Sequence, residues 1–436
     1  MRSKVTRAAL AAVAAGGIAA AGLATAAPAL AASVNVPCQV PALAYAIAHA
    51  HNGDSLRLAS NCTYLLHSAL PPVTKTVTLE GRNTTILRSY RGGTPAFSLL
   101  SVGVGGGLTV ANINFRNGDA SVEGGAIYGE NGPVTVIGGT FTDNYSGEYG
   151  GAIWNADYMT VNGARFINNS AEYGGAIYND EEATIENSTF LGNSGEYGGA
   201  AYNGEDTTIA NSTFTGNHTS VYGGGVEVGD DTTTLTGDTF TRNSSAYGGA
   251  IEVESGTLHV AGGYFGLNLA SGDGAGIADY SIATVDHTTF TGNEADGEGG
   301  GVDVDGTSLA MHDVRLNSNT AEYGGGVYSE TPMTLGGVLF SGNTAVDGGG
   351  LYNDDTAYVY GATVRENQAS GAGGGIYNET DETLHLFGSL VTENNAPAGE
   401  GGGIFNDGTV TLTHTLVVHN TLNNCSPAAS VPGCFG

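Results

Sequence analysis

The chain has 436 residues, of which 72 are glycine, and it carries 13 Lys and Arg side chains against 43 Asp and Glu. This much glycine without a collagen period favours a turn-rich or repetitive β structure over a helical domain. The net charge of −30 argues against nucleic acid as a partner, because phosphate binding requires clustered Lys and Arg.

The first 31 residues have the three parts of a secretory signal peptide. The basic stretch MRSKVTR precedes an apolar run rich in Ala and Gly, and the small residues Ala29 to Ala31 form a cleavage motif. We interpret residues 1–31 as a cleaved signal peptide rather than a membrane anchor. No later apolar stretch is long enough to span a bilayer. We therefore expect a secreted, extracellular protein that is not an integral membrane protein.

Residues 32–75 are expected to cap the N-terminal end. The segment PALAYAIAHAHNGD, residues 41–54, predicts one short amphipathic helix. Residues 76–122 are expected to form irregular first coils, since runs such as TVTLEG and LTVANINF alternate apolar and polar residues. Residues 421–436 are expected to form a C-terminal cap.

The four cysteines lie in two local pairs, one near each end of the chain. Cys38 and Cys62 fall in the N-terminal cap, and Cys425 and Cys434 in the C-terminal cap. Four cysteines allow three pairings, and we expect the two local ones, which an oxidising exterior permits. Zinc binding is the alternative, but the spacings fit no common zinc site.

Residues 123–420 form a repeat. Its first signal is an anchor residue, mostly aliphatic, after each glycine-rich pair, and successive anchors are 24 to 28 residues apart: Ile127, Ile153, Ile177, Ala201, Val226, Ile251, Ile277, Val302, Val327, Leu351, Ile376 and Ile404. A second signal, FxxN, recurs in phase, with Phe141, Phe166, Phe190, Phe214, Phe240, Phe265 and Phe290. Three short strands in about 25 residues predict one coil of a parallel β-helix.

Stacking the coils explains the two signals. At the ~4.8 Å spacing of paired strands, the anchors would form one buried column and the phenylalanines another. The Asn three residues after each Phe is expected in a turn, where its amide bonds its counterparts in adjacent coils. Parallel crossovers predict a right-handed solenoid.

The alternating tetrapeptides GGA[ILV] and FxxN resemble the repeats of the chlamydial polymorphic outer-membrane proteins and of related secreted bacterial β-helix proteins. The likeness covers residue 123 to about residue 420. It implies an all-β, right-handed parallel β-helix, a solenoid like that of pectate lyases, with adhesion-like roles. The sequence ends at Gly436, soon after the last repeat, so we expect it to lack the translocator barrel of that family.

The residue after each anchor is predicted to point outward, because side chains alternate along a strand. This outer column reads Tyr128, Trp154, Tyr178, Tyr202, Glu227, Glu252, Ala278, Asp303, Tyr328, Tyr352, Tyr377 and Phe405. We call a coil aromatic or acidic by its residue in this column. The residue that follows is Asn in most aromatic coils and Val in three acidic coils. A second outer column, four residues before the anchors, holds tyrosines interrupted by Asp273 and Glu298.

We interpret this outer face as a candidate binding face for polysaccharide or a cell-surface component. The candidate residues are Tyr128, Trp154, Tyr178, Tyr202, Glu227, Glu252, Glu254, Asp303, Asp305, Tyr328 and Tyr352. Outward rings would offer platforms for sugars, and the carboxylates could bond hydroxyls or hold Ca²⁺, although the sequence demands no cofactor.

Two alternatives stay open. Stacked rings could simply stabilise the sheet, at ~0.2–1 kcal/mol per pair, which leaves the break in the column unexplained. The chain could also be a polysaccharide lyase or glycoside hydrolase, with the pairs Glu252/Glu254 and Asp303/Asp305 as acid and base. The sequence contains none of the polygalacturonase signatures GHG, NTD and RIK. We therefore assign no catalytic residue and favour a binding, adhesion or structural rod over an enzyme.

Overall fold

A computed structural model describes residues 31–90, 92–397, 399–427 and 429–435. The predicted signal peptide, residues 1–31, lies outside the described residues except for Ala31. Within the described part of the chain, no helix has both the length and the apolar character needed to cross a bilayer.

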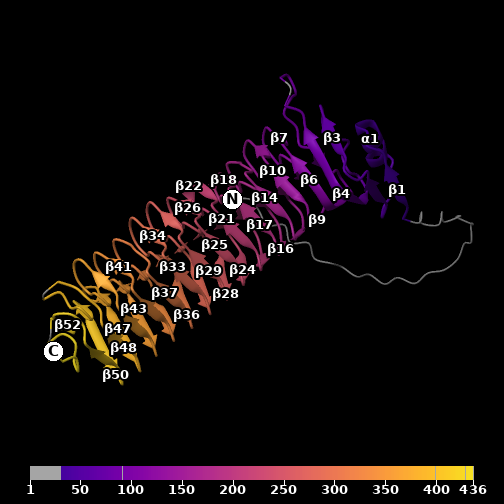
Figure 1. The fold of residues 1–436 in the computed structure, drawn as a ribbon. Helices are drawn as coiled ribbons and strands as arrows, with labels where there is room; N and C mark the ends of the chain where they lie inside the picture. Colours follow the sequence, from indigo (N-terminus) through magenta and orange to yellow (C-terminus); the bar gives the residue numbers. More distant parts are fainter. Residues whose placement is uncertain (1–30, 91, 398, 428, 436) are drawn as a thin grey trace, which may run out of the picture. The chain divides into compact units, whose positions relative to one another are not determined.

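Fourteen parallel strands, contributed by successive coils, form the sheet that carries the candidate site. Figure 1 shows these coils following one another from the indigo N-terminal end to the yellow C-terminal end. In order, the strands are β5 (Leu100–Ser101), β8 (Ile127–Gly129), β12 (Ile153–Asn155), β15 (Ile177–Asn179), β19 (Ala201–Asn203), β23 (Val226–Val228), β27 (Ile251–Val253), β31 (Ile277–Asp279), β35 (Val302–Val304), β38 (Val327–Ser329), β42 (Leu351–Asn353), β46 (Ile376–Asn378), β49 (Ile404–Asn406) and β52 (Cys425–Ser426). The predicted all-β parallel solenoid is confirmed.

A Gly-Gly pair builds a tight corner before most strands of this sheet. Gly174 has a φ of +61°, and a Cβ there would lie 2.0 Å from the carbonyl oxygen of Ile177. At Gly175 a Cβ would lie 2.2 Å from the carbonyl oxygen of Gly199 in the next coil. Glycine suits both the left-handed turn and the close approach of the neighbouring coil, and before β31 the second position is taken by Ala275.

Two further strands follow in each regular coil, and several coils add a fourth. The run ATIENSTF forms β16 (Ala183–Glu186) and β17 (Thr189–Leu191), separated by Asn187 with a φ of +51°. Five fourth strands pair into a small sheet of their own: β18 (Ser194–Tyr197), β22 (His218–Tyr222), β26 (Ser244–Ser245), β30 (Leu269–Ala270) and β34 (Glu294–Ala295). Four more form two-stranded sheets, β7 (Asp119–Ala120) with β11 (Tyr145–Ser146) and β41 (Thr344–Ala345) with β45 (Gln368–Ala369). The predicted three strands recur in the regular coils, and the fourth strands were not predicted because they are short and have little apolar alternation.

The first coils are less regular than the later ones. Two strands are long, β4 (Thr76–Arg88) and β6 (Gly107–Arg116). Each spans the part of a coil that forms two separate strands in the later coils. Their pairing shifts register between Glu80 and Thr84.

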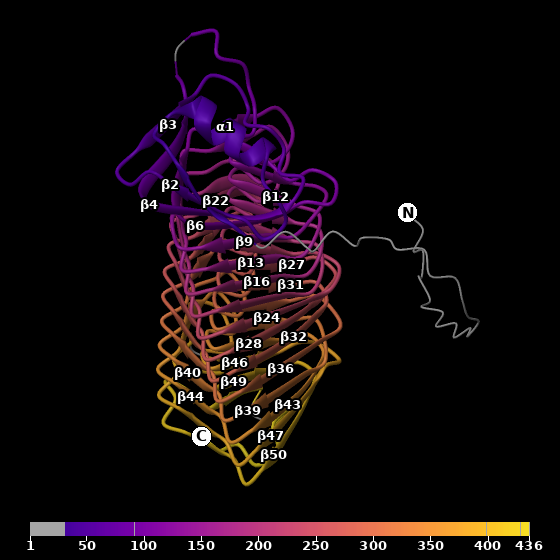
Figure 2. The same cartoon turned by 90° about the vertical axis from the view of Figure 1, so that its right-hand side faces the viewer.

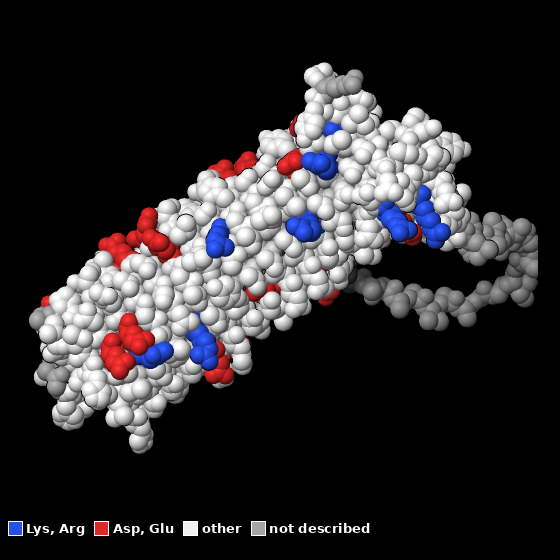
Figure 3. Space-filling view, in the orientation of Figure 1, with Lys and Arg blue, Asp and Glu red and all other residues white. Residues whose placement is uncertain are grey.

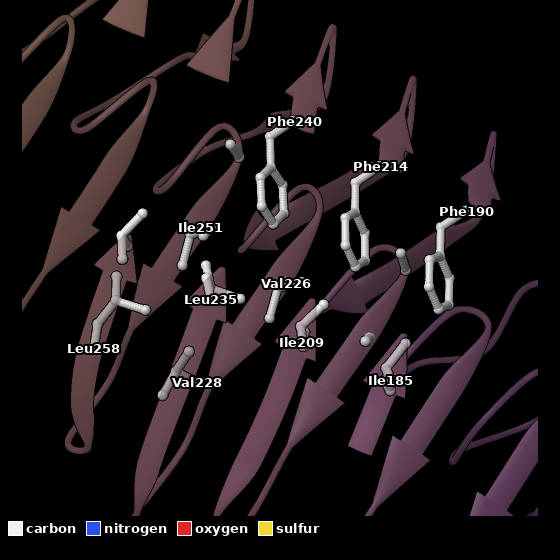
Figure 4. Close-up of a cluster of buried hydrophobic side chains, with 14 of the residues drawn as sticks. Ile185, Phe190, Ile209, Phe214, Val226, Val228, Leu235, Phe240, Ile251 and Leu258 are labelled. Carbon is white, nitrogen blue, oxygen red and sulfur yellow. The ribbon is translucent and has the colours of Figure 1, made fainter. Parts of the chain in front are cut away.

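The interior of the solenoid is a set of columns. All seven predicted phenylalanines are 0% exposed, and the ring centroids of Phe190 and Phe214 lie 4.6 Å apart with an interplanar angle of 1°. Figure 4 shows Phe190, Phe214 and Phe240 in a row, each facing an aliphatic side chain of its own coil. The anchors are equally buried. Both predicted core columns are confirmed.

A buried asparagine ladder closes the turn after the phenylalanine column. The side-chain amide of Asn193 donates to the carbonyl of Phe166 (3.1 Å) and to Oδ1 of Asn217 (3.0 Å). Oδ1 of Asn193 in turn accepts from the side-chain amide of Asn169 at 2.9 Å. These residues are buried, so the ladder satisfies polar groups that would otherwise lose their hydrogen bonds to water. This prediction is confirmed.

Helix α1 (Val40–Ala48) lies at the N-terminal end of the stack, where Figure 2 shows it in front of the coils. Leu43 and Ile47 pack into the core. The predicted helix was too long at its C-terminal end, because the carboxylate of Asp54 accepts the backbone N–H groups of Ala32 and His51, both at 2.8 Å, and holds that segment as a turn.

Both predicted disulfides are present. Cys38 bonds Cys62 and Cys425 bonds Cys434, across 24 and 9 residues of sequence. The two bonds are local, so each stabilises one end of the solenoid without joining the ends.

Candidate functional site

The outer column of the fourteen-stranded sheet is continuous in space. The middle residue of each three-residue strand points away from the core, and neighbouring strands pair in register. Tyr202 therefore lies beside Glu227, and Glu227 beside Glu252. Ala278, Asp303 and Tyr328 continue the same row. The structure thus brings the predicted outer-column residues together. Glu254 and Asp305, which come directly after β27 and β35, lie on the same outer side.

The outer column is much less accessible than the sequence predicted. Glu227 and Glu252 are each 2% exposed and Asp303 is 0% exposed, while Trp154, Tyr328 and Tyr352 are also buried. Tyr128, Tyr178 and Tyr202 are half-buried. Side chains four residues before the anchors stand over the column: the ring of Tyr149 meets Tyr178 edge-on at 4.8 Å, and Tyr173 meets Tyr202 at 5.9 Å.

Most ring faces of the outer column are covered by the rings of neighbouring coils. The rings of Tyr178 and Tyr202 stack at 5.0 Å with an interplanar angle of 9°, and Tyr352 and Tyr377 stack at 4.6 Å and 8°. These stacked rings of the outer column form an aromatic ladder, in which each ring face covers its neighbour. Two rings next to acids keep one face uncovered. Tyr202 adjoins Glu227 and Tyr328 adjoins Asp303, and among the described residues no ring stacks on that side of either tyrosine.

A hollow of about 600 Å³ opens where the ladder is interrupted. Its floor is formed by Glu227 and Glu252, with Glu254 beside them. Its walls are tyrosines from the neighbouring rows and coils, namely Tyr173, Tyr197, Tyr202, Tyr222 and Tyr280. The hollow thus combines ring surfaces with a carboxyl floor.

The two floor carboxyls are neutral at neutral pH. Burial, with repulsion from Glu252 and Glu254, raises the pKa of Glu227 to about 9. Burial, with repulsion from Glu254 and Asp279, raises the pKa of Glu252 to about 8. One oxygen of each, Oε2, is buried without a hydrogen-bond partner. A protonated carboxyl can donate one hydrogen bond and accept others, so both groups are available to a polar ligand.

Basic side chains do not neutralise this face. In the described part of the chain, the ion pairs of arginine lie elsewhere, such as Arg116 with Asp143 at 3.5 Å and Arg365 with Glu366 at 3.1 Å. Figure 3 shows Lys and Arg side chains lying singly along one face, several of them next to acids. None of the ion pairs among the described residues involves Glu227, Glu252 or Asp303.

A second acidic group lies further along the column, at β35. Carboxyl oxygens of Glu298, Asp303 and Asp305 all lie within 4.8 Å of one another. Burial, followed by repulsion from Asp305 and other acids, raises the pKa of Asp303 well above its usual range. Both oxygens of Asp303 are buried without a hydrogen-bond partner.

Six residues of the site escaped the sequence-based choice of candidates, and three of them, Tyr173, Tyr197 and Tyr222, belong to the second outer column. Tyr280 lines the hollow and lies three residues after its anchor. Side chains at this position point outward again, and in two neighbouring coils they are Glu254 and Asp305. Glu298 was recognised in the second outer column but not chosen. Asp279 lies where neighbouring strands place a core valine; burial raises its pKa to about 7. A search of all outward rows would have found Tyr280 and Glu298.

Solved structures of similar architecture are distant. The A-module of a mannuronan C-5 epimerase from Azotobacter vinelandii is 14% identical, with a TM-score of 0.36 over 86% of this chain and 94% of that chain. A surface adhesin of Streptococcus pneumoniae is 14% identical (TM-score 0.34, 86% of each chain), and an alginate lyase is 11% identical (TM-score 0.30, 90% of this chain and 76% of that chain). No curated protein matches the sequence.

The sequence itself gives the stronger match. The right-handed β-helix region family matches residues 81–240 and 173–352, which together span more than half of the chain. This match covers coils of both the aromatic and the acidic kind and agrees with the predicted handedness. The chain belongs to the right-handed β-helix region family.

Proposed function

We propose that this protein is an extracellular β-helix rod that binds neutral saccharide chains at the interruption in its aromatic ladder. The observation that carries the proposal is the hollow of about 600 Å³ with tyrosine walls and the carboxyl floor of Glu227 and Glu252. The signal-peptide pattern of residues 1–31 and the two disulfides support a location outside the cell.

The chemistry of the hollow suits a sugar. A pyranose ring has an apolar C–H face and a rim of hydroxyls, so it needs a flat apolar surface together with groups that both donate and accept hydrogen bonds. Tyr202 supplies the surface, because its ring face toward Glu227 is not covered by another ring. The protonated carboxyls of Glu227 and Glu252 supply the hydrogen bonds.

Neutral saccharides are favoured over acidic ones. The hollow is lined by three glutamates and no Lys or Arg. An anionic sugar would repel any ionised carboxyl nearby and so raise the free energy of ionising it. It would also find no Lys or Arg with which to form an ion pair.

Binding fits the floor carboxyls better than hydrolysis does. Glycoside hydrolysis requires one protonated carboxyl as the acid and one ionised carboxylate as the base or nucleophile. Burial raises the pKa of Glu227 and of Glu252 in the same direction, to about 9 and about 8, so these two floor groups do not form an acid–base pair with each other at neutral pH. A lyase would need a base and a positive charge, and the hollow holds no Arg, Lys or His.

A glycan array probed with the secreted protein tests the proposal, followed by calorimetric titration of the tightest neutral oligosaccharide. We expect Tyr202→Ala to weaken binding at least tenfold, since it removes the uncovered ring at the edge of the hollow. Tyr377→Ala is the matched control, because the Tyr377 ring is stacked between Tyr352 and Phe405 at 4.6 and 4.9 Å. It should change binding less than twofold.

Three results would contradict the proposal. The array could show no bound neutral glycan, or both tyrosine variants could lose affinity equally, which would mean general loss of structure. Release of new reducing ends from the bound polymer would replace binding by glycoside hydrolysis.

A further inference from the structure

Three carboxylates of a single coil converge at β35. Glu298 precedes a run of three glycines, residues 299–301, and Asp303 and Asp305 follow it. The corner folds the chain tightly: Gly299 has a φ of +59°, and a Cβ there would lie 2.5 Å from the backbone nitrogen of Asp303. The turn that closes this coil therefore brings Glu298 over the strand, where its carboxyl lies within 4.8 Å of those of Asp303 and Asp305.

Asp303 is the residue that distinguishes this group from an ordinary acidic surface. Its side chain is 0% exposed, and neither carboxyl oxygen has a hydrogen-bond partner. A buried carboxyl without a hydrogen bond or a counter-ion is costly. A ligand that satisfies both oxygens at once would remove that cost.

The neighbours of this group include the smallest side chain of the outer column and supply no cation. Ala278, beside Asp303 in the outer column, is the smallest side chain of that column. Asp273 accepts the backbone N–H of Glu298 at 2.8 Å, and Glu330 accepts the hydroxyl of Tyr328 at 2.9 Å. Within the described residues no Lys, Arg or His forms an ion pair with these acids.

We propose that Glu298, Asp303 and Asp305 together bind one Ca²⁺ ion on the outer face of β35. Ca²⁺ takes about six to eight oxygen ligands in an adaptable geometry, and carboxylates are its usual protein ligands. Three carboxylates supply part of this set and water supplies the rest. Zn²⁺ favours nitrogen and sulfur ligands, and Mg²⁺ demands a stricter octahedron, so an all-carboxylate group of this kind fits Ca²⁺ better.

This site is separate from the saccharide hollow. The hollow centres on β23 and β27, and the Ca²⁺ ligands belong to the coil of β35, with the coil of β31 between them. The inference therefore does not rest on the proposed function, and each can fail without the other.

Calorimetric titration of the chelator-treated protein with CaCl₂ tests the site. We expect one Ca²⁺ per chain, a melting temperature that rises with added CaCl₂, and at least tenfold weaker binding for Asp303→Asn. Glu252→Gln is the matched control, because it also removes a buried, unpartnered carboxyl from the same column but lies outside the group. Its Ca²⁺ affinity should stay within twofold of the wild type.

The melting temperature without Ca²⁺ shows whether Asp303→Asn is folded. That variant should melt at or above the wild-type temperature in chelator, because it removes a buried repulsive charge, and should lose only the rise produced by Ca²⁺. The proposal is overturned if the wild type shows neither Ca²⁺ heat nor a rise in melting temperature. It is equally overturned if Asp303→Asn binds as tightly as the wild type, or if Mg²⁺ binds as tightly as Ca²⁺. Tyr202→Ala should retain full Ca²⁺ binding.

Discussion

The aromatic coils around β15 and the acidic coils around β27 share one backbone and one interior. In both, the anchor is 0% exposed, the phenylalanine column runs through, and the asparagine ladder continues, for example from Asn243 to Asn268 at 3.1 Å. They differ at the outward residue, which is Tyr178 in one and Glu252 in the other. The interior thus determines the fold, and the outer column is free to carry a function.

The second difference lies one residue further on. Asn179 donates a side-chain hydrogen bond to the carbonyl of Glu181 and closes the turn after β15, whereas Val253 is an apolar core residue. The next backbone bond is common to both kinds of coil: Glu254 donates to the carbonyl of Val228 at 2.9 Å, and Asp180 donates to the carbonyl of Asn155 at 3.0 Å. The change from Tyr-Asn to Glu-Val therefore alters both the outer face and the turn that flanks it.

The largest expected effect tests whether the two kinds of coil share a core. Phe190→Ala in the aromatic coils and Phe265→Ala in the acidic coils should each lower the free energy of unfolding by ~3–5 kcal/mol, because each leaves a cavity in a stacked column. Chemical denaturation measures both. Leu191→Ala is the control, since Leu191 neighbours Phe190 but is 38% exposed, and it should cost less than about 1 kcal/mol. Losses that differ by more than about 2 kcal/mol between the two phenylalanines would show that the interiors are not equivalent.

The asparagine ladder should give the next largest effect, again equal in both regions. Asn193→Ala and Asn268→Ala each remove a buried amide that bonds the coils before and after it. The polar groups left behind lose their partners, so we expect a loss of ~1–3 kcal/mol for each in the same denaturation experiment. A loss confined to one region would mean that the ladder supports only some coils.

The sequence predicted the interior far better than the outer face. Repeats with a fixed period stack in only one register, so Phe190, Ile177 and Asn193 could each be placed from spacing alone. The burial of Glu252 could not be predicted, because it depends on tyrosines from other rows that stand over the column. Tyr202 was a candidate from the sequence, but whether its ring face is covered depends on the side chain in the next coil.

The buried glutamates of the acidic coils should make stability depend on pH. The folded-state pKa values of Glu227 and Glu252 are raised to about 9 and about 8, from about 4.5 in the unfolded chain. An acid with a raised folded pKa contributes its full stability below its unfolded pKa and loses it as pH rises through the folded pKa. In chelator, the melting temperature should therefore fall between pH 5 and pH 9.

The double variant Glu227→Gln/Glu252→Gln isolates that contribution. Its melting temperature should fall less steeply with pH than that of the wild type, by calorimetry in the same buffers. Glu181→Gln, an exposed change in an aromatic coil, should leave the wild-type slope unchanged. Equal slopes for the wild type and the double variant would contradict the assigned pKa shifts.

The smallest expected effect converts one kind of coil into the other. Glu252→Tyr places a ring in the acidic segment of the column and removes a carboxyl that repels Glu254. Above pH 8 we expect a gain of about 1 kcal/mol or less in the free energy of unfolding. Ala278→Tyr is a useful comparison, since it adds a ring in the next coil without removing a charge. A loss of stability in Glu252→Tyr would mean that the interruption is required by the fold.

The central claim is that the interruption of the aromatic ladder is a binding site, and saccharide binding by Glu252→Tyr tests it most directly. The added ring would fill the hollow between Tyr202 and Tyr280. Titration of the tightest neutral oligosaccharide at pH 7 should show binding to the wild type and at least a hundredfold loss in Glu252→Tyr, while the variant melts no lower than the wild type. Wild-type affinity in a folded Glu252→Tyr variant would contradict the account.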